Sequence, residues 1–307
     1  FQLRGDQKTS PQIVLIQLNQ HDFDRAFEDR TNSLGLMSEV TDFTDSFFWN
    51  RKLWTDLLTR ILKQQPKTIG VSLYFGENIG TIHLIGIGGI GMSALARYFN
   101  KQGVVVSGYD KTPTLLTDAL IKEGIQIHFE DDLTKIDKEA SVIVYTPAIP
   151  SNHGELNYFK ENGYLVVKRS DVLQWITENA FTIAIAGTHG KTTTTSMTAH
   201  ILRHTGYGCN AFLGGIASNY GTNFWSHEKN VVVVEADEYD RSFLKLAPNI
   251  AVITAVDPDH LDIYGTAEEV VKAFGEFSDK IKTGGWLIRK WNTVFNTLES
   301  NKTILNY

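Results

Sequence analysis

The chain has 307 residues, 42% hydrophobic and 21% charged, which allows two or three packed domains. Its net charge of −6 argues against a nucleic acid or an anionic membrane as a partner. The single cysteine, Cys209, excludes a disulfide within the chain, and neither a signal peptide nor an apolar run of the ~20 residues that span a bilayer is visible. We therefore expect a cytoplasmic protein with no membrane partner.

Residues 1–80 predict a small α/β extension. A strand is expected at 11–18, a helix at 53–63 and a second strand at 66–75, with a polar, turn-rich stretch after the first strand. The Phe-Trp-Asn-Arg helix start at 48–51 and the second strand weakly resemble a CHASE-type bacterial sensor domain. That resemblance implies ligand sensing outside the membrane. The alternative is an α/β extension that belongs to no recognised family.

A glycine-rich turn follows a predicted buried strand at 82–85 and precedes a predicted helix at 92–99. Its glycines fit the pattern G-x-G-x-x-G, which binds a diphosphate at a helix start: Gly86, Gly88 and Gly91. The next strand, 104–109, ends at Asp110, where an acid that binds a ribose would lie. Alone, this pattern is typical of an NAD site, or of a turn that serves only close packing.

Helical and strand patterns alternate in the segment that follows. Helices are predicted at 115–121 and 156–162, and strands at 125–129 and 142–145. Such alternation predicts a parallel sheet with right-handed crossovers. Residues 168–171 join this region to the next domain, and Ser170 or Asp171 is the expected cap of the following helix.

A second glycine turn lies between the apolar run 182–186 and a helix-compatible segment at 194–204. Its sequence, Gly-Thr-His-Gly-Lys-Thr-Thr at 187–193, is a shortened variant of the P-loop, since Ile185 stands where that pattern has glycine. Backbone amides in such a turn and the helix N-terminus bind phosphate, and Thr192 is placed to reach a Mg²⁺ on the same phosphates. The alternative is an ordinary helix start.

Two further apolar runs, 230–234 and 250–256, predict strands buried on both faces. The first ends in Glu235, which is placed to hold Mg²⁺ directly or through water. The second leads to Asp257, Asp259 and His260. The alternatives are a solvated acidic loop at Glu235, a structural role for His260, and turn chemistry around Pro258.

Four motifs in this order resemble the Mur ligases, from about residue 82 to about 287. They lie at 83–93, 187–195, 235–238 and 257–262. The resemblance implies an α/β fold in which a Rossmann-like UDP-substrate domain precedes a P-loop ATPase-type domain. It also implies an ATP-dependent ligase that joins L-alanine to UDP-N-acetylmuramate through an acyl phosphate, in peptidoglycan precursor synthesis. Residues 242–246 and the run from Asp257 to His260 favour this activity over that of recycling ligases, which attach a whole peptide.

The resemblance further implies which residues form the sites. ATP is expected on Gly187, Thr188, His189, Gly190, Lys191, Thr192 and Thr193. The UDP-linked substrate is expected on Gly86, Gly88, Gly89, Ile90, Gly91, Met92 and Asp110. Catalysis is implied for Lys191, Glu235 and His260, and the Mg²⁺ ligands are implied to be Thr192, Glu235 and His260. Asp237 and Glu238 are expected to support this site without contacting the ligands directly.

We expect three segments: an extension at 1–80, a UDP-substrate domain at 81–170 and an incomplete ATP-binding domain at 171–307. After a predicted strand at 285–288, the tail carries Trp291, Phe295 and Leu298 at helical spacing. The family has a third domain that closes over ATP, so we expect weak nucleotide binding and poor turnover. The rival hypotheses are a sensor module fused to an inert ligase fragment, an NAD enzyme, and a folate-type glutamate ligase. The acceptor amino acid and the oligomeric state stay open.

Overall fold

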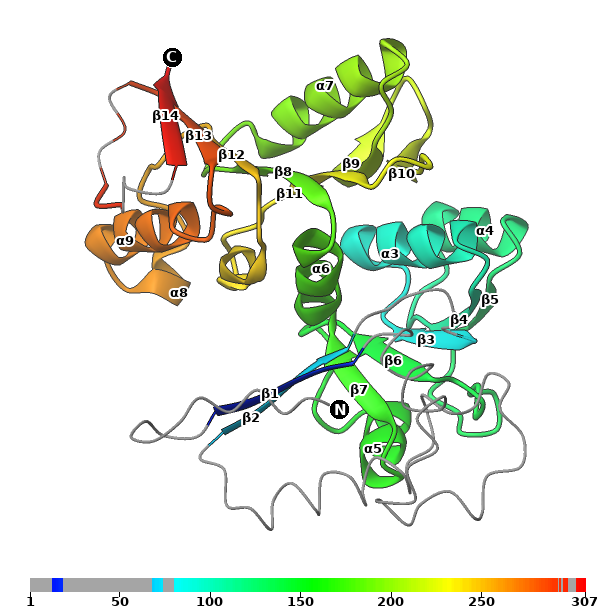
Figure 1. Ribbon diagram of the computed structural model, residues 1–307. Helices are drawn as coiled ribbons and strands as arrows, with labels where there is room; N and C mark the ends of the chain where they lie inside the picture. Colours follow the sequence, from blue (N-terminus) through cyan, green and yellow to red (C-terminus); the bar gives the residue numbers. More distant parts are fainter. Residues whose placement is uncertain (1–12, 19–67, 74–79, 292, 294, 298–301) are drawn as a thin grey trace, which may run out of the picture. The chain divides into compact units, whose positions relative to one another are not determined.

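The computed structural model in Figure 1 describes residues 13–18, 68–73, 80–291, 293, 295–297 and 302–307. Contacts divide the chain into two units, Phe1–Gly80 and Thr81–Tyr307, which we describe separately. In the first unit, β1 (Ile13–Leu18) pairs in parallel with β2 (Thr68–Leu73), within the two strands expected there. The helix expected at 53–63 lies outside the described residues.

The second unit begins with a five-stranded parallel sheet in the order β5-β4-β3-β6-β7. Its strands are β3 (Thr81–Ile85), β4 (Val105–Tyr109), β5 (Gln126–His128), β6 (Val142–Tyr145) and β7 (Leu165–Lys168). Its helices are α3 (Ile90–Lys101), α4 (Leu115–Lys122) and α5 (Gly154–Glu161). α3 and α4 lie on one side of the sheet and α5 on the other (Figure 1). The alternation of strands and helices predicted from the sequence is confirmed.

The start of α6 (Arg169–Glu178) differs from the prediction. Lys168, rather than Ser170 or Asp171, is the N-cap residue, and the backbone N–H of Lys168 donates to Asp171 Oδ2 at 3.0 Å. Asp171 therefore lies in the first turn, where a carboxylate also interacts favourably with the helix dipole. This helix follows the last strand of the first sheet and leads into the second sheet.

The second sheet has seven strands in the order β10-β9-β11-β8-β12-β13-β14. They are β8 (Phe181–Ala186), β9 (Asn210–Ala217), β10 (Thr222–Trp225), β11 (Val231–Glu235), β12 (Ile250–Ile253), β13 (Gly285–Arg289) and β14 (Lys302–Asn306). The helical segments are α7 (Lys191–His204), η2 (Ser242–Lys245), α8 (Leu261–Tyr264) and α9 (Ala267–Ser278). β9 and β10 form an antiparallel pair that the sequence reading missed, and the other neighbours are parallel.

Two predicted elements of this sheet need correction. The strand expected at 250–256 ends at Ile253, because the next residues turn toward the loop after β8. The helical spacing noted in the tail is misleading, since none of the described residues from 291 to 297 is helical. Residues 302–306 instead form β14, which extends the sheet beside β13. Leu298 lies outside the described residues.

Apolar side chains cover both faces of the central part of the second sheet. The four valines of β11 are at most 7% exposed, as expected of a strand covered on both sides. Cys209 belongs to the core that this sheet shares with α7, and burial raises the pKa of its thiol to about 11, so it is a packing residue. Among the described residues, no helix is both long and apolar enough to cross a bilayer.

Candidate active site

Three neighbouring parallel strands bring their carboxyl ends together at one edge of the second sheet. Glu235, the last residue of β11, pairs in register with Ile185 of β8. Ile253, the last residue of β12, pairs with Ala186 of β8 on the other side. Ligands bind at this edge of open α/β sheets, and the glycine turn 187–190 begins there.

The glycine turn has a backbone that only glycine readily adopts. Gly187 has a φ of +132°, and a side chain there would overlap Thr254 Oγ1 and lie 2.9 Å from Ala255 N. The amide of Thr188 donates to Ala255 O at 3.0 Å, which ties the turn to the segment after β12. Gly190, with a φ of +80°, is the N-cap of the 14-residue helix α7. Unpaired amides at such a helix start form an anion-binding site.

Lys191, the first residue of α7, contacts a carboxylate that the sequence reading expected only in a supporting role. Its Nζ donates to Glu238 Oε1 at 2.7 Å and to Gly187 O at 2.8 Å. The Glu238 side chain is 1% exposed, so the lysine charge compensates a buried carboxylate. Glu238 lies three residues beyond the end of β11, and nothing in the sequence there indicates that its side chain is buried.

Thr192 and Glu235 are brought together as the prediction requires. Thr192 Oγ1 donates to Glu235 Oε1 at 3.0 Å, and the amide of Gly214 in β9 donates to Oε2 at 3.0 Å. Burial raises the pKa of the Glu235 carboxyl, and Asp237 adds to the rise, while these two hydrogen bonds and the Lys191 charge oppose it. A carboxylate in this position is favoured further by a cation beside it.

His260 lies beside Glu238 rather than in direct contact with Glu235. Among the described residues, the carboxylate oxygens within 4 Å of its Nε2 belong to Glu238, at 3.9 Å, and Asp259, at 3.8 Å. Its ring stands edge-on to Tyr239, with centroids 5.1 Å apart. His260 has a φ of +53° and caps α8. It therefore joins the predicted cluster through Glu238.

Asp257 contacts the glycine turn. Thr188 Oγ1 donates to Asp257 Oδ2 at 3.3 Å and accepts from the Asp257 amide at 3.1 Å. His189 Nε2 lies 3.7 Å from the same carboxylate, and both of these side chains are exposed. Asp257 thus stabilises the glycine turn, and the turn chemistry around Pro258 that was kept open for it stays a prediction.

The residues at this edge have the chemistry that Mg²⁺ and a polyphosphate require. Thr192 and Glu235 offer hard oxygen donors, which Mg²⁺ prefers. Glu238 Oε2 is buried and, in the described part of the chain, has no hydrogen-bond partner. Gly187 and Gly190, at the two ends of the turn, both have a positive φ, which glycine adopts without strain. The donor set therefore fits a magnesium nucleotide.

The first glycine turn is held by hydrogen bonds to the end of β4. The amide of Gly86, which has a φ of +87°, donates to Tyr109 O at 2.7 Å. The amide of Gly88 donates to Asp110 Oδ2 at 2.7 Å, and Asp110 Oδ1 accepts from the Thr112 amide at 3.1 Å. Asp110 therefore positions this turn, and its expected contact with a ribose stays a prediction.

An arginine that sequence reasoning missed lies over Gly91, the last glycine of this turn. A side chain at Gly91 would overlap the guanidinium of Arg169, the first residue of α6. Ile90 is partly exposed at the start of α3, whereas Met92 is 2% exposed and packs in the core. Arg169 is 78 residues from Gly91 in sequence, so only the fold brings them together.

Asn223 of β10 connects this turn's helix to the second sheet. Its Nδ2 donates to Ile90 O at 2.6 Å and to Ser93 Oγ at 2.9 Å, both in α3. Its Oδ1 accepts from Arg97. The side chain of Asn223 is fully buried. The β9–β10 hairpin therefore contacts α3 through Asn223 and Glu235 through Gly214.

At the carboxyl edge of the parallel sheet, a lysine, a hydroxyl and carboxylates meet at a glycine turn. This arrangement is typical of nucleotide-binding α/β proteins of the P-loop type. A second, Rossmann-like sheet with its own glycine turn precedes it. The chain belongs to the Mur ligase family. Residues 81–180 match the model described as "Mur ligase family, catalytic domain", and residues 185–303 match the Mur ligase middle domain.

Individual relatives agree with this assignment. The UDP-N-acetylmuramate–L-alanine ligase of Porphyromonas gingivalis is 52% identical over 233 residues, which are 74% of this chain and 51% of that protein. The chain thus spans about half the length of the curated relatives it matches. The solved UDP-N-acetylmuramate–alanine ligase of Thermotoga maritima is 30% identical, with a TM-score of 0.62 over 69% of this chain and 49% of that one.

A solved ligase of a different specificity is also similar. The UDP-N-acetylmuramate:L-alanyl-gamma-D-glutamyl-meso-diaminopimelate ligase from Neisseria meningitides is 26% identical, with a TM-score of 0.65. The match covers 70% of this chain and 72% of that one. The likeness therefore extends over both described domains and includes ligases with different acceptors.

Gly214 is expected to be required for the geometry around Glu235. In the Gly214→Ala variant the new methyl group would lie 2.7 Å from Glu235 Oε1, so the carboxylate must move away from Thr192. We expect at least a tenfold loss of affinity for ATP–Mg²⁺, about 1.4 kcal/mol, by isothermal titration calorimetry. The matched control is Gly215→Ala, whose methyl group meets Thr192 Cγ2 at an ordinary 3.4 Å. Equal affinities of the two variants would contradict this prediction.

Proposed function

We propose that this chain acts in an ATP- and Mg²⁺-dependent ligase that joins L-alanine to UDP-N-acetylmuramate in peptidoglycan precursor synthesis. The observation that carries the proposal is the meeting of Lys191, Thr192, Glu235 and Glu238 at the glycine turn after β8. The 52% identity to an L-alanine ligase supports this acceptor. A cytoplasmic location is part of the proposal, since ATP supplies the energy.

The proposed chemistry activates a carboxylate and then forms an amide. The γ-phosphoryl group of ATP passes to the carboxylate of the muramic acid, and ADP leaves. The L-alanine amine then attacks the acyl phosphate, displaces phosphate and loses a proton to form the amide. Lys191 neutralises charge on the transferring group, and the amides of the turn at 187–190 hold the polyphosphate. Thr192 and Glu235 are the proposed Mg²⁺ ligands, with His260 oriented beside Glu238. Mg²⁺ would supply charge neutralisation between the phosphates.

The UDP-linked substrate is proposed to bind at the turn from Gly86 to Gly91. In the described part of the chain no side chain caps the start of α3, and such a helix N-terminus favours a diphosphate. The exposed edge of Ile90 and the guanidinium of Arg169 lie at the same turn and complete a surface suited to an anionic ligand. Asp110 positions the turn through Gly88.

Thermal unfolding with separate ligands tests the proposal. A ligand that binds the folded state at 100 times its Kd stabilises it by about 2.7 kcal/mol. We expect ATP–Mg²⁺ and UDP-N-acetylmuramate each to raise the apparent Tm, and Lys191→Ala to lose only the first effect. Stabilisation by NAD instead would indicate a dinucleotide enzyme. The absence of a shift with both proposed ligands would overturn the proposal.

A peptide acceptor is the second candidate, because the similar Neisseria structure is a ligase for a tripeptide. Amide formation can be measured with two acceptors, L-alanine and L-alanyl-γ-D-glutamyl-meso-diaminopimelate. Each reaction contains ATP and either UDP-N-acetylmuramate or a free N-acetylmuramate derivative. A product only with L-alanine supports the first candidate, and a product only with the tripeptide supports the second.

A further inference from the structure

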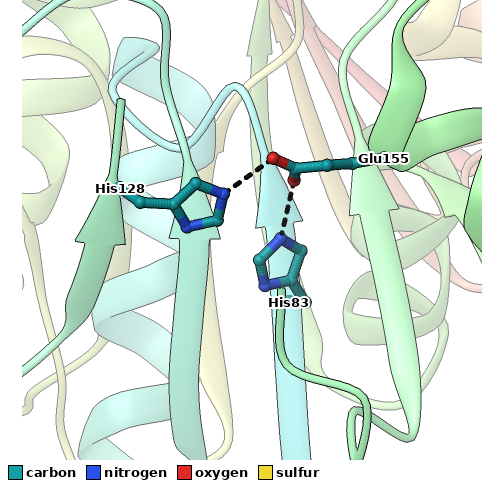
Figure 2. Close-up of side chains that lie close together, drawn as sticks. All are labelled: His83, His128 and Glu155. Carbon is teal, nitrogen blue, oxygen red and sulfur yellow. Dashed lines mark hydrogen bonds and ion pairs between the residues drawn. The ribbon is translucent and has the colours of Figure 1, made fainter. Parts of the chain in front are cut away.

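Three side chains meet in the five-stranded sheet, outside both glycine turns. His83 comes from β3, His128 from the end of β5 and Glu155 from the first turn of α5. Figure 2 shows a ring nitrogen of each imidazole directed at the carboxylate of Glu155. His128 Nε2 lies 2.7 Å from Glu155 Oε1, and His83 Nε2 lies 3.4 Å from Oε2. No step of the proposed ligase reaction uses these groups.

The carboxylate of Glu155 is placed where water cannot stabilise its charge. The side chains of Glu155 and His83 are both 0% exposed, and that of His128 is 13% exposed. A buried carboxylate requires a compensating cation. The side chains that contact Glu155 in the described structure are two imidazoles, so this cation is either a proton on one ring or a metal ion among all three groups.

The donor atoms are those of a transition-metal site. Two imidazole nitrogens and one carboxylate oxygen form a ligand set that is typical of Zn²⁺. One donor atom from each residue lies within 4.8 Å of the other two. In the described part of the chain this is the one group of three such residues with donors this close. Bonds of about 2.0–2.2 Å place the donors of a tetrahedral ion about 3.5 Å apart. A donor pair at the 4.8 Å limit would therefore need to close by about 1 Å, whereas the 2.7 Å between His128 Nε2 and Glu155 Oε1 would need to widen. A water molecule would take the fourth position.

The surrounding side chains orient the ligands. His83 Nδ1 is hydrogen bonded with Ser107 Oγ at 2.9 Å, which leaves Nε2 directed at Glu155. Metal-binding histidines have such a partner on their second nitrogen, and it fixes the tautomer and the ring orientation. The His83 ring also packs on Phe159, with centroids 5.4 Å apart. Asp131 accepts the amide of Glu155 at 2.9 Å and so fixes the start of α5.

From this geometry we propose that His83, His128 and Glu155 form a Zn²⁺ site that joins β3, β5 and α5. The ion has a structural role, because it links three elements that are far apart in sequence and lies in the domain that carries the first glycine turn. His83 is three residues before Gly86. The slight exposure of His128 gives the ion its route from solvent.

Calorimetric titration of the tag-free chain tests this site. The protein is stripped of metal with a chelator, dialysed, and titrated with Zn²⁺ in excess Mg²⁺, which occupies the nucleotide site. We expect one Zn²⁺ per chain and a higher apparent Tm with Zn²⁺. Glu155→Gln and His128→Gln, which keep side-chain size and polarity, should each lower the affinity more than tenfold. Ser107→Ala should lower it 10- to 100-fold through the orientation of His83.

A second histidine pair provides the matched control. His200 and His204 stack on consecutive turns of α7, with centroids 5.6 Å apart, and could bind Zn²⁺ at the surface. The variant His200→Gln/His204→Gln should keep the stoichiometric site. Circular dichroism checks the fold of each variant, and the wild-type titration is decisive if a variant fails to fold. Three results would each overturn the proposal in favour of a protonated hydrogen-bonded network. They are failure of the folded wild-type chain to bind one Zn²⁺, unchanged affinity in Glu155→Gln, and loss of binding in the α7 variant.

Discussion

Replacing Lys191 with alanine is expected to abolish stabilisation by ATP–Mg²⁺ and to destabilise the protein without ligand. The variant removes the cation that lies 2.7 Å from Glu238, whose side chain is 1% exposed. Breaking a buried ion pair by removing one partner costs about 3–5 kcal/mol, and the partial exposure of the lysine lowers our expectation to about 2–3 kcal/mol. Urea unfolding with and without nucleotide measures both effects.

The control separates the structural effect of Lys191 from its effect on ligand binding. In the double variant Lys191→Met/Glu238→Leu, both partners are replaced by apolar side chains of similar size, so most of the lost stability should return. Nucleotide binding should not return, because the lysine charge that we propose to contact the phosphates is still missing. An ATP–Mg²⁺ shift of wild-type size in either variant would contradict the proposed role of this lysine.

Gly187→Ala is expected to disrupt the turn that we propose to bind phosphate. Its φ of +132° is unfavourable for any residue with a side chain, and the new methyl group would meet the backbone of Ala255 as well as Thr254. We expect a loss of about 3 kcal/mol or more in the free energy of unfolding, together with loss of ATP–Mg²⁺ binding. Differential scanning calorimetry and a titration with nucleotide measure these two results.

Gly190→Ala is the matched control for this variant. Gly190 also has a positive φ, +80°, but the nearest atom to a new methyl group is Thr254 Cβ at 4.0 Å. Only the left-handed backbone is then penalised, by about 1–2 kcal/mol. If both glycine variants lose the same stability, steric overlap with the segment after β12 is not the cause.

Local patterns predicted the centre of the second sheet well. The continuous valines of β11 indicate a strand buried on both faces, and the glycine turn after β8 indicates a phosphate site. Since carboxyl ends of adjacent parallel strands share an edge, the proximity of Thr192 and Glu235 followed from sequence. The β9–β10 hairpin was missed, because Gly214 and Gly215 interrupt its strand pattern.

Contacts that depend on long-range folding could not be predicted. Glu238 was expected only to support the site, since nothing in its local sequence indicates a fully buried partner for Lys191. His83 and Glu155 are 72 residues apart, and only the sheet order brings them together. The boundaries expected at 81–170 and 171–307 stay predictions, which limited proteolysis can test. The sensor-like resemblance falls mostly on residues outside the described part of the chain.

The hairpin of β9 and β10 links the site around the second glycine turn to the domain that carries the first. Asn223 holds it to α3, while the amide of Gly214, on the paired strand, holds one oxygen of Glu235. A rotation of the two sheets that pulls Asn223 from α3 would displace Gly214 as well. If the proposed function holds, substrate bound at the first turn would then influence the proposed cation ligands Thr192 and Glu235, and phosphoryl transfer would require the two domains to be aligned.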